Sequence, residues 1–453
     1  MILKYSVLAL LAAIFITASD PFFGAEKLFE FRPEAKKDVE EVTWLTPEKV
    51  KPYLHDHHNR VSDLFKVSDY YFPNVYFWFL IYTQFDSNQI VVHDKRNLKL
   101  IYKVLDFTDL RQKELPLNTR YVLQQKISSE KLSELKKDLD HLISNPYSLE
   151  PRAKSLYHIF KKASAVLPVN KKDRVAFFKN LREDIRTQTG QRNFIKDGLV
   201  RSLPYQGFLN EQLKGMGLPT EIKSIPFLES SFNPRAHSKV SAKGVWQFMP
   251  LIASYYVPKR TNDLDYRSNV GVSSVAASYL MSENFKILKK WDLAVTAYNS
   301  GTKHLLASKR KLASVDIDLE DIIRHSDSGH FGFASKNFFS EFLALAHTIA
   351  YKEELFRDLH DHERNDTAID LKFYLLKCSQ RLDKLLNEKQ LDDVIFHNDQ
   401  FTQWNRPFPR GSIFTSKSYL PKEKFFQVKS EVMRKIKPKD WDNLLKNQSC
   451  STR

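Results

Sequence analysis

One carboxylate among apolar side chains constrains the centre of this chain more than any other feature. Glu229 lies in the run Ile-Pro-Phe-Leu-Glu-Ser-Ser-Phe, and its apolar neighbours are Ile225, Phe227, Leu228 and Phe232. Because loss of hydration disfavours a charged carboxyl group, this setting is expected to raise the pKa of Glu229 into the range of a general acid near neutral pH. The alternative is a Glu on the exposed face of a short helix, since glutamate is rarely buried.

The segment from Gly207 to Lys352 is predicted to contain several short helices joined by loops. Thr220 is expected to cap a helix that runs through Glu229 and ends at Asn233-Pro234. Asn269 and Asp292 are predicted to cap two later helices, and Pro250 suits a first helical turn.

Three further clusters follow Glu229 along the chain. Gly244-Val245-Trp246-Gln247 forms a predicted tight turn, in which Trp246 either shields the carboxyl or stacks on a sugar face, and Gln247 offers a donor and an acceptor. Asp265-Tyr266-Arg267 contains a charge pair that is expected to pin a loop. Ala297-Tyr298-Asn299-Ser300-Gly301 places a hydroxyl and an amide at a predicted helix end. Taken singly, each cluster is more typical of packing or capping.

The order and separation of these motifs resemble the lytic murein transglycosylases of the goose-lysozyme-like superfamily, most closely the membrane-bound D type. The similarity is dense from about Gly207 to Gly301 and weaker over Asn74–Phe107. It implies a mainly helical, α+β protein with a lysozyme-like catalytic domain. It also implies cleavage of the β-1,4 bond between N-acetylmuramic acid and N-acetylglucosamine in peptidoglycan, which leaves 1,6-anhydro-muramic acid ends.

The resemblance also implies roles for individual residues. Glu229 matches the catalytic acid/base; the implied substrate-binding residues are Ser230, Ser238, Gln247, Tyr298 and Asn299, and those implied to give structural support are Trp246, Asp265 and Arg267. The chain departs from the family where Val240-Ser241 replaces an Ala-Gly step, and where Asn269 and Val270 replace an acidic residue and a proline. The first departure is expected to alter the loop beside the cleft.

The carboxylate pattern bears on the reaction type. Two-carboxylate glycosidases need a second acid about 5 to 9.5 Å from the first, and no Asp or Glu occurs between Ser230 and Asn262. This agrees with the family's implied mechanism, in which Glu229 acts alone, without metal or cofactor. A hydrolytic muramidase and a non-catalytic peptidoglycan-binding envelope protein remain as alternatives.

The N-terminal part is predicted to hold a signal peptide and a separate module. Residues 1–19 combine Lys4, an apolar run from Val7 to Ile16 and small residues before the expected cleavage point, with an uncleaved anchor or a buried helix as the alternatives. Export places the mature protein in the periplasm or cell envelope. Residues 20–200 are predicted to be mostly helical; the elements expected there are strands at Gln89–Asp94 and Leu98–Phe107 and a helix at Ser129–Ile143 with one face formed by Leu132, Leu135, Leu139 and Leu142.

After the catalytic domain, predicted at residues 201–352, the chain changes to a small α+β pattern. Residues 365–425 resemble a divergent LysM module, and a cap that only packs on the enzyme is the alternative; the predicted elements are strands at Lys372–Leu376 and Ser412–Ser418 and short helices at Gln380–Leu386 and Leu391–Phe396. Residues 426–453 are predicted to be a basic tail. Cys378 and Cys450 permit at most one intramolecular disulfide, which export allows but does not establish.

The formal net charge of +16 indicates an anionic partner. For an exported protein, the carboxylates of cell-wall peptides or an anionic envelope surface fit better than nucleic acid, for which no binding motif is present. A monomer in peripheral contact with the envelope is expected. The cluster His55-Asp56-His57-His58 leaves metal binding open, although a solvated surface is the more ordinary interpretation because the ligand spacing on a defined element is missing.

Overall fold

A computed structural model describes the chain from residue 44 to residue 450, except for residues 113–114, 260–264, 313–315, 326–330, 360–370 and 399–405. It divides into two compact units. The first unit comprises Ser68–Phe194 with the described residues up to Leu54, and the second comprises His55–Val67 with the chain from Ile195 onward. Over the described residues, no helix combines the length and apolar character needed to cross a membrane. The predicted signal peptide lies outside these residues.

The first unit is built around a three-stranded antiparallel sheet in the order β2-β1-β3. The strands are β1 (Gln89–Asp94), β2 (Ile101–Asp106) and β3 (Ile185–Thr189). The two predicted strands are confirmed, whereas β3 was not predicted because its sequence Ile-Arg-Thr-Gln-Thr has little apolar character. The helix α2 (Phe72–Thr83) is buried along most of its length.

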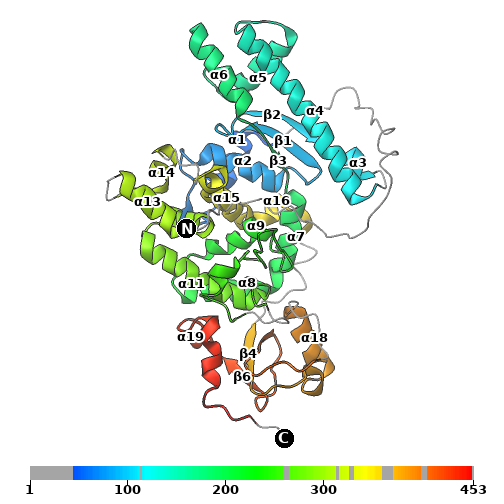
Figure 1. Cartoon of the computed structure of the whole chain (residues 1–453), viewed down its shortest axis with the longest axis vertical. Helices are drawn as coiled ribbons and strands as arrows, with labels where there is room; N and C mark the ends of the chain where they lie inside the picture. Colours follow the sequence, from blue (N-terminus) through cyan, green and yellow to red (C-terminus); the bar gives the residue numbers. More distant parts are fainter. Residues whose placement is uncertain are drawn as a thin grey trace, which may run out of the picture. The chain divides into compact units, whose positions relative to one another are not determined.

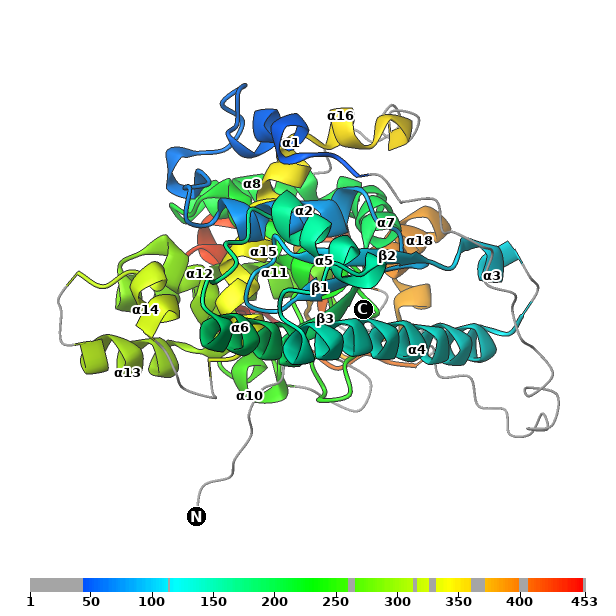
Figure 2. The same ribbon diagram turned by 90° about the horizontal axis from the view of Figure 1, so that it is seen from above.

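Three helices complete the core of this unit: α4 (Leu117–Ser144), α5 (Pro151–Lys162) and α6 (Lys171–Glu183). In Figures 1 and 2, α6 lies along the long helix α4. The predicted helix at Ser129–Ile143 is confirmed as part of α4, and Leu135, Leu139 and Leu142 are buried in the core against the sheet residues. The unit also contains α1 (Pro47–Leu54) and α3 (Thr108–Gln112).

Short and medium helices build the larger part of the second unit, as the sequence predicted. Those that frame the candidate site are α7 (Arg192–Ser202), which continues from the first unit, α8 (Gln206–Gly215), α9 (Ile225–Ser230), α11 (Val270–Leu288), α12 (Trp291–Ser300) and α15 (Phe333–Ala350). The others are η2 (Asp63–Phe65), η3 (Leu203–Tyr205), η4 (Thr220–Ser224), α10 (Pro250–Ala253), α13 (Thr302–Leu312), α14 (Leu319–His325), α16 (Lys352–Leu355) and η5 (Arg357–Leu359).

The capping predictions for these helices had mixed outcomes. Asn269 caps α11, because its side chain accepts a hydrogen bond from the Val272 amide. The predicted cap at Asp292 is wrong: α12 already begins at Trp291, and Asp292 instead accepts hydrogen bonds from the amides of Leu293 and Leu319. The single helix predicted from Thr220 to Glu229 is two elements, η4 and α9, with a proline at the start of α9, where its missing N–H is tolerated.

The C-terminal module forms a second three-stranded antiparallel sheet, in the order β5-β4-β6. Its elements are β4 (Lys372–Leu376), η6 (Leu382–Lys384), α18 (Glu388–His397), β5 (Ile413–Ser416), β6 (Phe425–Val428), α19 (Ser430–Met433) and η7 (Pro438–Leu445). Both predicted strands are confirmed. The helix predicted at Gln380–Leu386 is only the short turn η6, and the one predicted at Leu391–Phe396 is α18.

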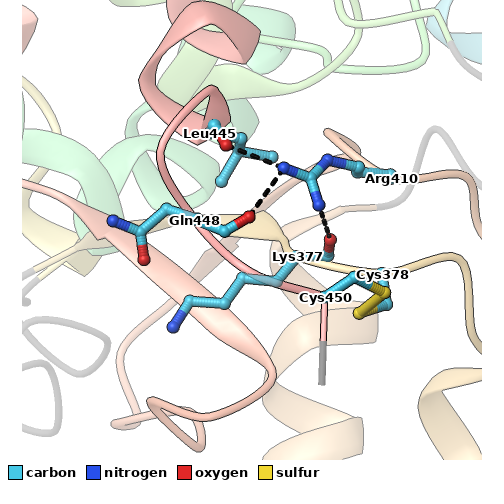
Figure 3. The surroundings of a disulfide bond; sticks show 6 residues. All are labelled: Lys377, Cys378, Arg410, Leu445, Gln448 and Cys450. Carbon is cyan, nitrogen blue, oxygen red and sulfur yellow. Dashed lines mark hydrogen bonds between the residues drawn. A yellow bond between two sulfur atoms is a disulfide. The ribbon is translucent and has the colours of Figure 1, made fainter. Parts of the chain in front are cut away.

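The stretch predicted as a separate basic tail is instead part of this module. The boundary placed after residue 425 falls inside β6, which pairs with β4, and Trp441 of η7 is fully buried. Cys378 and Cys450 form a disulfide (Figure 3). Beside it, the Arg410 guanidinium donates hydrogen bonds to the backbone oxygens of Lys377, Leu445 and Gln448, at 2.8, 2.7 and 3.0 Å. Basic residues on the surface had concealed the apolar anchors that fold this segment.

Candidate active site

Glu229 lies in the last turn of α9, immediately before a strained backbone. Ser231 and Phe232 both adopt left-handed conformations, with φ angles of 50° and 56°, and each such residue costs on the order of 1–2 kcal/mol. Two backbone hydrogen bonds close the helix end, from the Ser231 amide to Phe227 and from the Phe232 amide to Pro226, at 2.9 and 3.0 Å. Because the Phe232 side chain is fully buried, packing holds this turn and thereby fixes the position of Glu229.

Two residues of the helix α7 contact the same turn. The Arg201 guanidinium donates hydrogen bonds to the backbone oxygens of Ser231 and Phe232, at 2.7 and 3.2 Å. A Cβ atom at Gly198 would lie 2.5 Å from the Ser231 oxygen, so only glycine permits this approach of α7. Neither residue was predicted to matter, since both lie before the motifs and act only through the backbone.

The environment of Glu229 raises its pKa from an ordinary 4.5 to about 8. The larger cause is loss of hydration among apolar side chains, and the second is repulsion by the charge of Glu341. The residue remains partly exposed. In the described part of the chain, no hydrogen bond or ion pair stabilises its charged form. Glu229 is therefore mostly protonated at neutral pH and able to donate a proton.

Glu341, the charged group that acts on Glu229, was also not predicted from the sequence. It lies on α15, a helix that packs against α9 and α12, and its side chain is buried. It is also the one acidic residue in the apolar sequence of α15, which was the available signal. The acid-free stretch up to Asn262 did not exclude a carboxylate brought in by a later helix, and Glu341 is such a carboxylate.

Within the loop that follows α9, the turn at residues 244–247 contains two residues with positive φ. Gly244 has a φ of 77°, and a Cβ there would lie 1.8 Å from the backbone oxygen of Arg267, so glycine is required. Gln247 has a φ of 46°. Its side-chain amide nitrogen donates hydrogen bonds to the backbone oxygens of Gly244 and Ala236, at 2.8 and 3.3 Å. The Gln247 amide nitrogen thus holds the turn in shape.

Asp265 and Arg267 stabilise the conformation of this loop. The Arg267 guanidinium makes two hydrogen bonds to the Asp265 carboxylate, at 2.9 and 2.8 Å, and two to the backbone oxygens of Ser241 and Phe248, at 2.7 and 3.0 Å. Burial acts to raise the pKa of Asp265, but the hydrogen bonds and charge of Arg267 outweigh it and lower the pKa below its ordinary value. Arg267 therefore favours the ionised form of Asp265, and the pair has a structural role.

Tyr298 and Asn299 occupy the last turn of α12. The Tyr298 hydroxyl donates a hydrogen bond to the backbone oxygen of Trp246 at 2.7 Å. Burial, together with the charge of Glu229, raises the pKa of Tyr298 well above its ordinary value, so the hydroxyl keeps its proton. The Asn299 side-chain oxygen accepts a hydrogen bond from Ser335 of α15 at 3.1 Å. The end of α12 is thus attached both to the loop and to α15.

The remaining predicted residues serve the protein's own framework. The buried Ser230 donates hydrogen bonds to the backbone oxygens of Val245 and Pro226, at 2.9 and 3.0 Å, and so ties α9 to the loop. Ser238 accepts a hydrogen bond from the Ala242 amide at 2.9 Å and closes an outer turn. Stacking of Trp246 on a sugar, one of the two predicted roles, is wrong because its side chain is 1% exposed and its indole nitrogen donates to Ser274.

Two other sequence features find a structural explanation. Ser241, where the family usually has glycine, adopts a φ of 67°, a conformation that glycine takes without strain. In the histidine-rich cluster, Asp56 is buried and accepts hydrogen bonds from the amides of Arg60 and Val61 and from the Tyr351 hydroxyl. This carboxylate organises a loop of the second unit.

Residues 207–319 match the family of transglycosylase SLT domains. The matched segment includes α9, the loop and the end of α12, so the chain carries a transglycosylase SLT domain of a mainly helical, lysozyme-like fold. The resemblance inferred from the ordered motifs is confirmed over this domain.

Among known proteins, the domain is similar to the D-type enzymes. It is 34% identical over 122 residues to the membrane-bound lytic murein transglycosylase D of Escherichia coli K12, and equally to that of Escherichia coli O6:H1, covering 27% of this chain and 27% of each relative. It is also 33% identical over 108 residues to a protein of Alteromonas sp. named for tributyltin chloride resistance, covering 24% of this chain and 52% of that protein. The match thus spans about a quarter of the length of the Escherichia coli relatives.

Proposed function

We propose that the protein is a lytic transglycosylase that cleaves the β-1,4 bond between N-acetylmuramic acid and N-acetylglucosamine in peptidoglycan and leaves 1,6-anhydro-muramic acid ends. The observation that carries this proposal is the Glu229 carboxyl group, whose pKa is raised to about 8, at the end of α9 in an SLT domain. A carboxyl group that titrates near neutral pH suits a reaction in which one group must first donate a proton and then accept one.

The proposed reaction uses Glu229 twice. Protonated Glu229 donates its proton to the bridging oxygen as the glycosidic bond breaks, and the substrate's N-acetyl group stabilises the positive charge at the anomeric carbon. Ionised Glu229 then accepts the proton of the 6-hydroxyl group of the same sugar, whose oxygen bonds to the anomeric carbon. The enzyme ends protonated as it began, and the proposed mechanism uses no metal, cofactor or water.

Glu341 favours both halves of this cycle. Its charge raises the pKa of Glu229, so more of the enzyme holds the proton needed for bond cleavage. After the proton has left, the same repulsion makes the Glu229 carboxylate a stronger base toward the sugar hydroxyl. In this proposal Glu341 tunes Glu229 and does not touch the sugar.

Closing the anhydro ring requires the sugar to be held in one orientation, which is mainly an entropic task. We assign that task to the side chain of Asn299 and to the side-chain oxygen of Gln247, with Tyr298 fixing the end of α12 beside Glu229. Ser230 and Ser238 contribute by shaping α9 and the loop.

We also propose that the protein works outside the cytoplasm, in the periplasm or cell envelope, as a monomer. The apolar run Val7–Ile16 supports export. The helix α13 supports contact with anions: it carries Lys303, Lys309, Arg310 and Lys311 and no acidic residue. Because it follows α12 directly, its charges are suited to attract the carboxylates of peptidoglycan stem peptides or of the envelope surface.

The decisive experiment digests purified sacculi with the full chain and with Glu229→Gln. Glu211→Gln, at an exposed position of α8, is the matched control. Mass spectrometry of the products is expected to show 1,6-anhydro-muramic acid ends for the wild type and the control, and none for Glu229→Gln. Reducing N-acetylmuramic acid ends would establish a hydrolase instead. Release of no fragments by any of the three proteins would favour a non-catalytic peptidoglycan-binding role.

A further inference from the structure

The C-terminal module is attached to the SLT domain through a buried polar contact at the start of α11. The Asn269 side-chain nitrogen donates hydrogen bonds to Asn398 Oδ1 and Thr415 Oγ1 of the module, at 2.9 and 3.3 Å. All three residues are fully buried. Since a buried polar group is costly when unpaired, a shift that broke these hydrogen bonds without admitting water would cost free energy at each group. These hydrogen bonds hold the module in one specific position on α11.

Close packing surrounds this polar contact. The Tyr266 hydroxyl accepts a hydrogen bond from the Ile413 amide of β5 at 2.9 Å. A Cβ atom at Gly271 would lie 2.8 Å from the Phe373 ring and 2.9 Å from the Thr415 methyl group, so β4 and β5 approach the α11 backbone as closely as glycine permits. The contact is therefore specific in both shape and hydrogen bonding.

The disulfide-linked end of the module makes a second contact along α11. The Tyr279 hydroxyl donates to the backbone oxygen of Met433 at 3.0 Å, and Lys437 forms an ion pair with Glu283 at 2.6 Å. The Lys439 amide donates to the backbone oxygen of Tyr256 at 3.1 Å. These residues precede Cys450, whose disulfide to Cys378 closes the segment onto the end of β4.

The same short segment of the SLT domain connects the module to the active-site loop. Asn269 and Tyr266 bind the module, while Arg267 between them binds the backbone oxygens of Ser241 and Phe248. Gln247, a residue assigned above to sugar positioning, lies in this loop. A displacement of residues 265–269 would thus move the loop through Arg267.

We infer that the C-terminal module stabilises the conformation of the active-site loop, residues 241–248. The module thereby supports turnover independently of any glycan binding of its own. This inference rests on the proposed function for its catalytic readout. The module holds residues 265–269, these hold the loop through Arg267, and the loop holds Gln247. Asn398, Thr415 and Tyr266 are therefore positioning residues, located outside the site.

The test uses the full chain with Tyr266→Phe and Thr415→Val, which each remove one hydroxyl group from the contact. Tyr374→Phe is the matched control, because Tyr374 is equally buried but its hydroxyl binds Ser418 inside the module. The substrate is a short soluble glycan of N-acetylglucosamine and N-acetylmuramic acid, too small to span the module and the site. A displacement of about 1 Å at a catalytic site can reduce turnover by as much as about 100-fold, so we expect kcat to fall at least severalfold for the contact variants and to stay within about twofold for the control. Thr415→Ser, which keeps the hydroxyl, is expected to restore kcat.

Amide hydrogen exchange provides a readout that does not depend on activity. If the module stabilises the loop, amide exchange at residues 241–248 should be faster in Tyr266→Phe and Thr415→Val and unchanged in Tyr374→Phe. Unchanged loop exchange in folded contact variants, or unchanged kcat with loss of sacculus binding only, would overturn the inference and leave the module as a glycan anchor. A wild type that releases no anhydro product would refute the proposed function. The exchange result would still show whether the module stabilises the loop.

Discussion

Glu229 and Asp265 are two carboxyl groups of the same domain, and the protein shifts their pKa values in opposite directions. Both lose hydration, which acts to raise the pKa of each. Glu229 has the charge of Glu341 nearby and its pKa rises to about 8. Asp265 has the bidentate guanidinium of Arg267, and its pKa falls below the ordinary value. Burial acts in the same direction on both groups, so it is the hydrogen-bonded guanidinium of Arg267 that reverses the direction of the pKa shift at Asp265.

The comparison separates the group suited to chemistry from the group that supports it. Near neutral pH Glu229 exchanges its proton, as a general acid and base must. Asp265 stays ionised, and its charge fixes Arg267, which in turn holds two backbone oxygens of the loop.

Glu229→Gln should lower kcat on peptidoglycan by about 10²–10⁴-fold or more, because general acid–base catalysis typically contributes that much.

The Glu229→Gln variant should also change the pH dependence of the free energy of unfolding. Since the folded pKa of Glu229 is raised from 4.5 to about 8, the wild type is stabilised below about pH 4.5 and loses this contribution as the pH rises through about 8. Urea unfolding at pH 5 and pH 9 should therefore show the variant gaining relative stability at the higher pH. An equal difference at both pH values would contradict the raised pKa.

Arg267→Ala should lower the free energy of unfolding by about 3–5 kcal/mol, the usual cost of removing one partner from a buried ion pair. The substitution removes the bidentate partner of the buried Asp265 carboxylate, which keeps only the more distant Lys243 ammonium at 3.5 Å, and it removes one hydrogen-bond donor each from the backbone oxygens of Ser241 and Phe248. Denaturant unfolding at pH 7 measures this loss. In Asp265→Asn the loss should shrink as the pH falls through the lowered pKa of Asp265, since the wild type itself loses that contribution there. A loss below about 1 kcal/mol for Arg267→Ala would place the pair among ordinary surface ion pairs.

Glu341→Gln should lower the pKa of Glu229 by removing the repulsion between the two carboxylates. The alkaline limb of the pH–rate profile, which reports loss of the Glu229 proton, should then move to lower pH. Glu353→Gln, at an exposed position of α16, is the control and should leave the limb in place. A limb that stays fixed, or moves to higher pH, in Glu341→Gln would show that Glu341 does not tune Glu229.

Ser241→Gly should stabilise the protein slightly. Relief of the left-handed strain at a φ of 67° is worth about 1–2 kcal/mol, against about 0.5–1 kcal/mol of extra backbone entropy lost by glycine on folding. We therefore expect a net gain of between zero and about 1.5 kcal/mol in urea unfolding. Ser254→Gly, at an ordinary φ of −59°, has no strain to relieve and should destabilise. Equal effects of the two substitutions would indicate that Ser241 is not strained.

Local patterns in the sequence predicted those parts of the fold that depend on local physics. The leucine periodicity of residues 129–143, the strand-forming runs and the Asn269 cap needed no knowledge of distant partners. The ordered motifs likewise predicted where Glu229, Gln247 and Tyr298 lie. Contacts between distant segments were not predictable in this way. Glu341 approaches Glu229 only because α15 packs on α9, and β6 was read as a basic tail because its pairing with β4 cannot be seen locally.

The raised pKa of Glu229 is tested most directly by a titration of its side-chain carboxyl carbon by ¹³C NMR, with the signal assigned by its absence in Glu229→Gln. We expect a midpoint near about 8, the pKa that burial and the charge of Glu341 impose on Glu229. A midpoint near the ordinary value of 4.5 would mean that Glu229 is ionised at neutral pH, and would contradict its role as the proton donor.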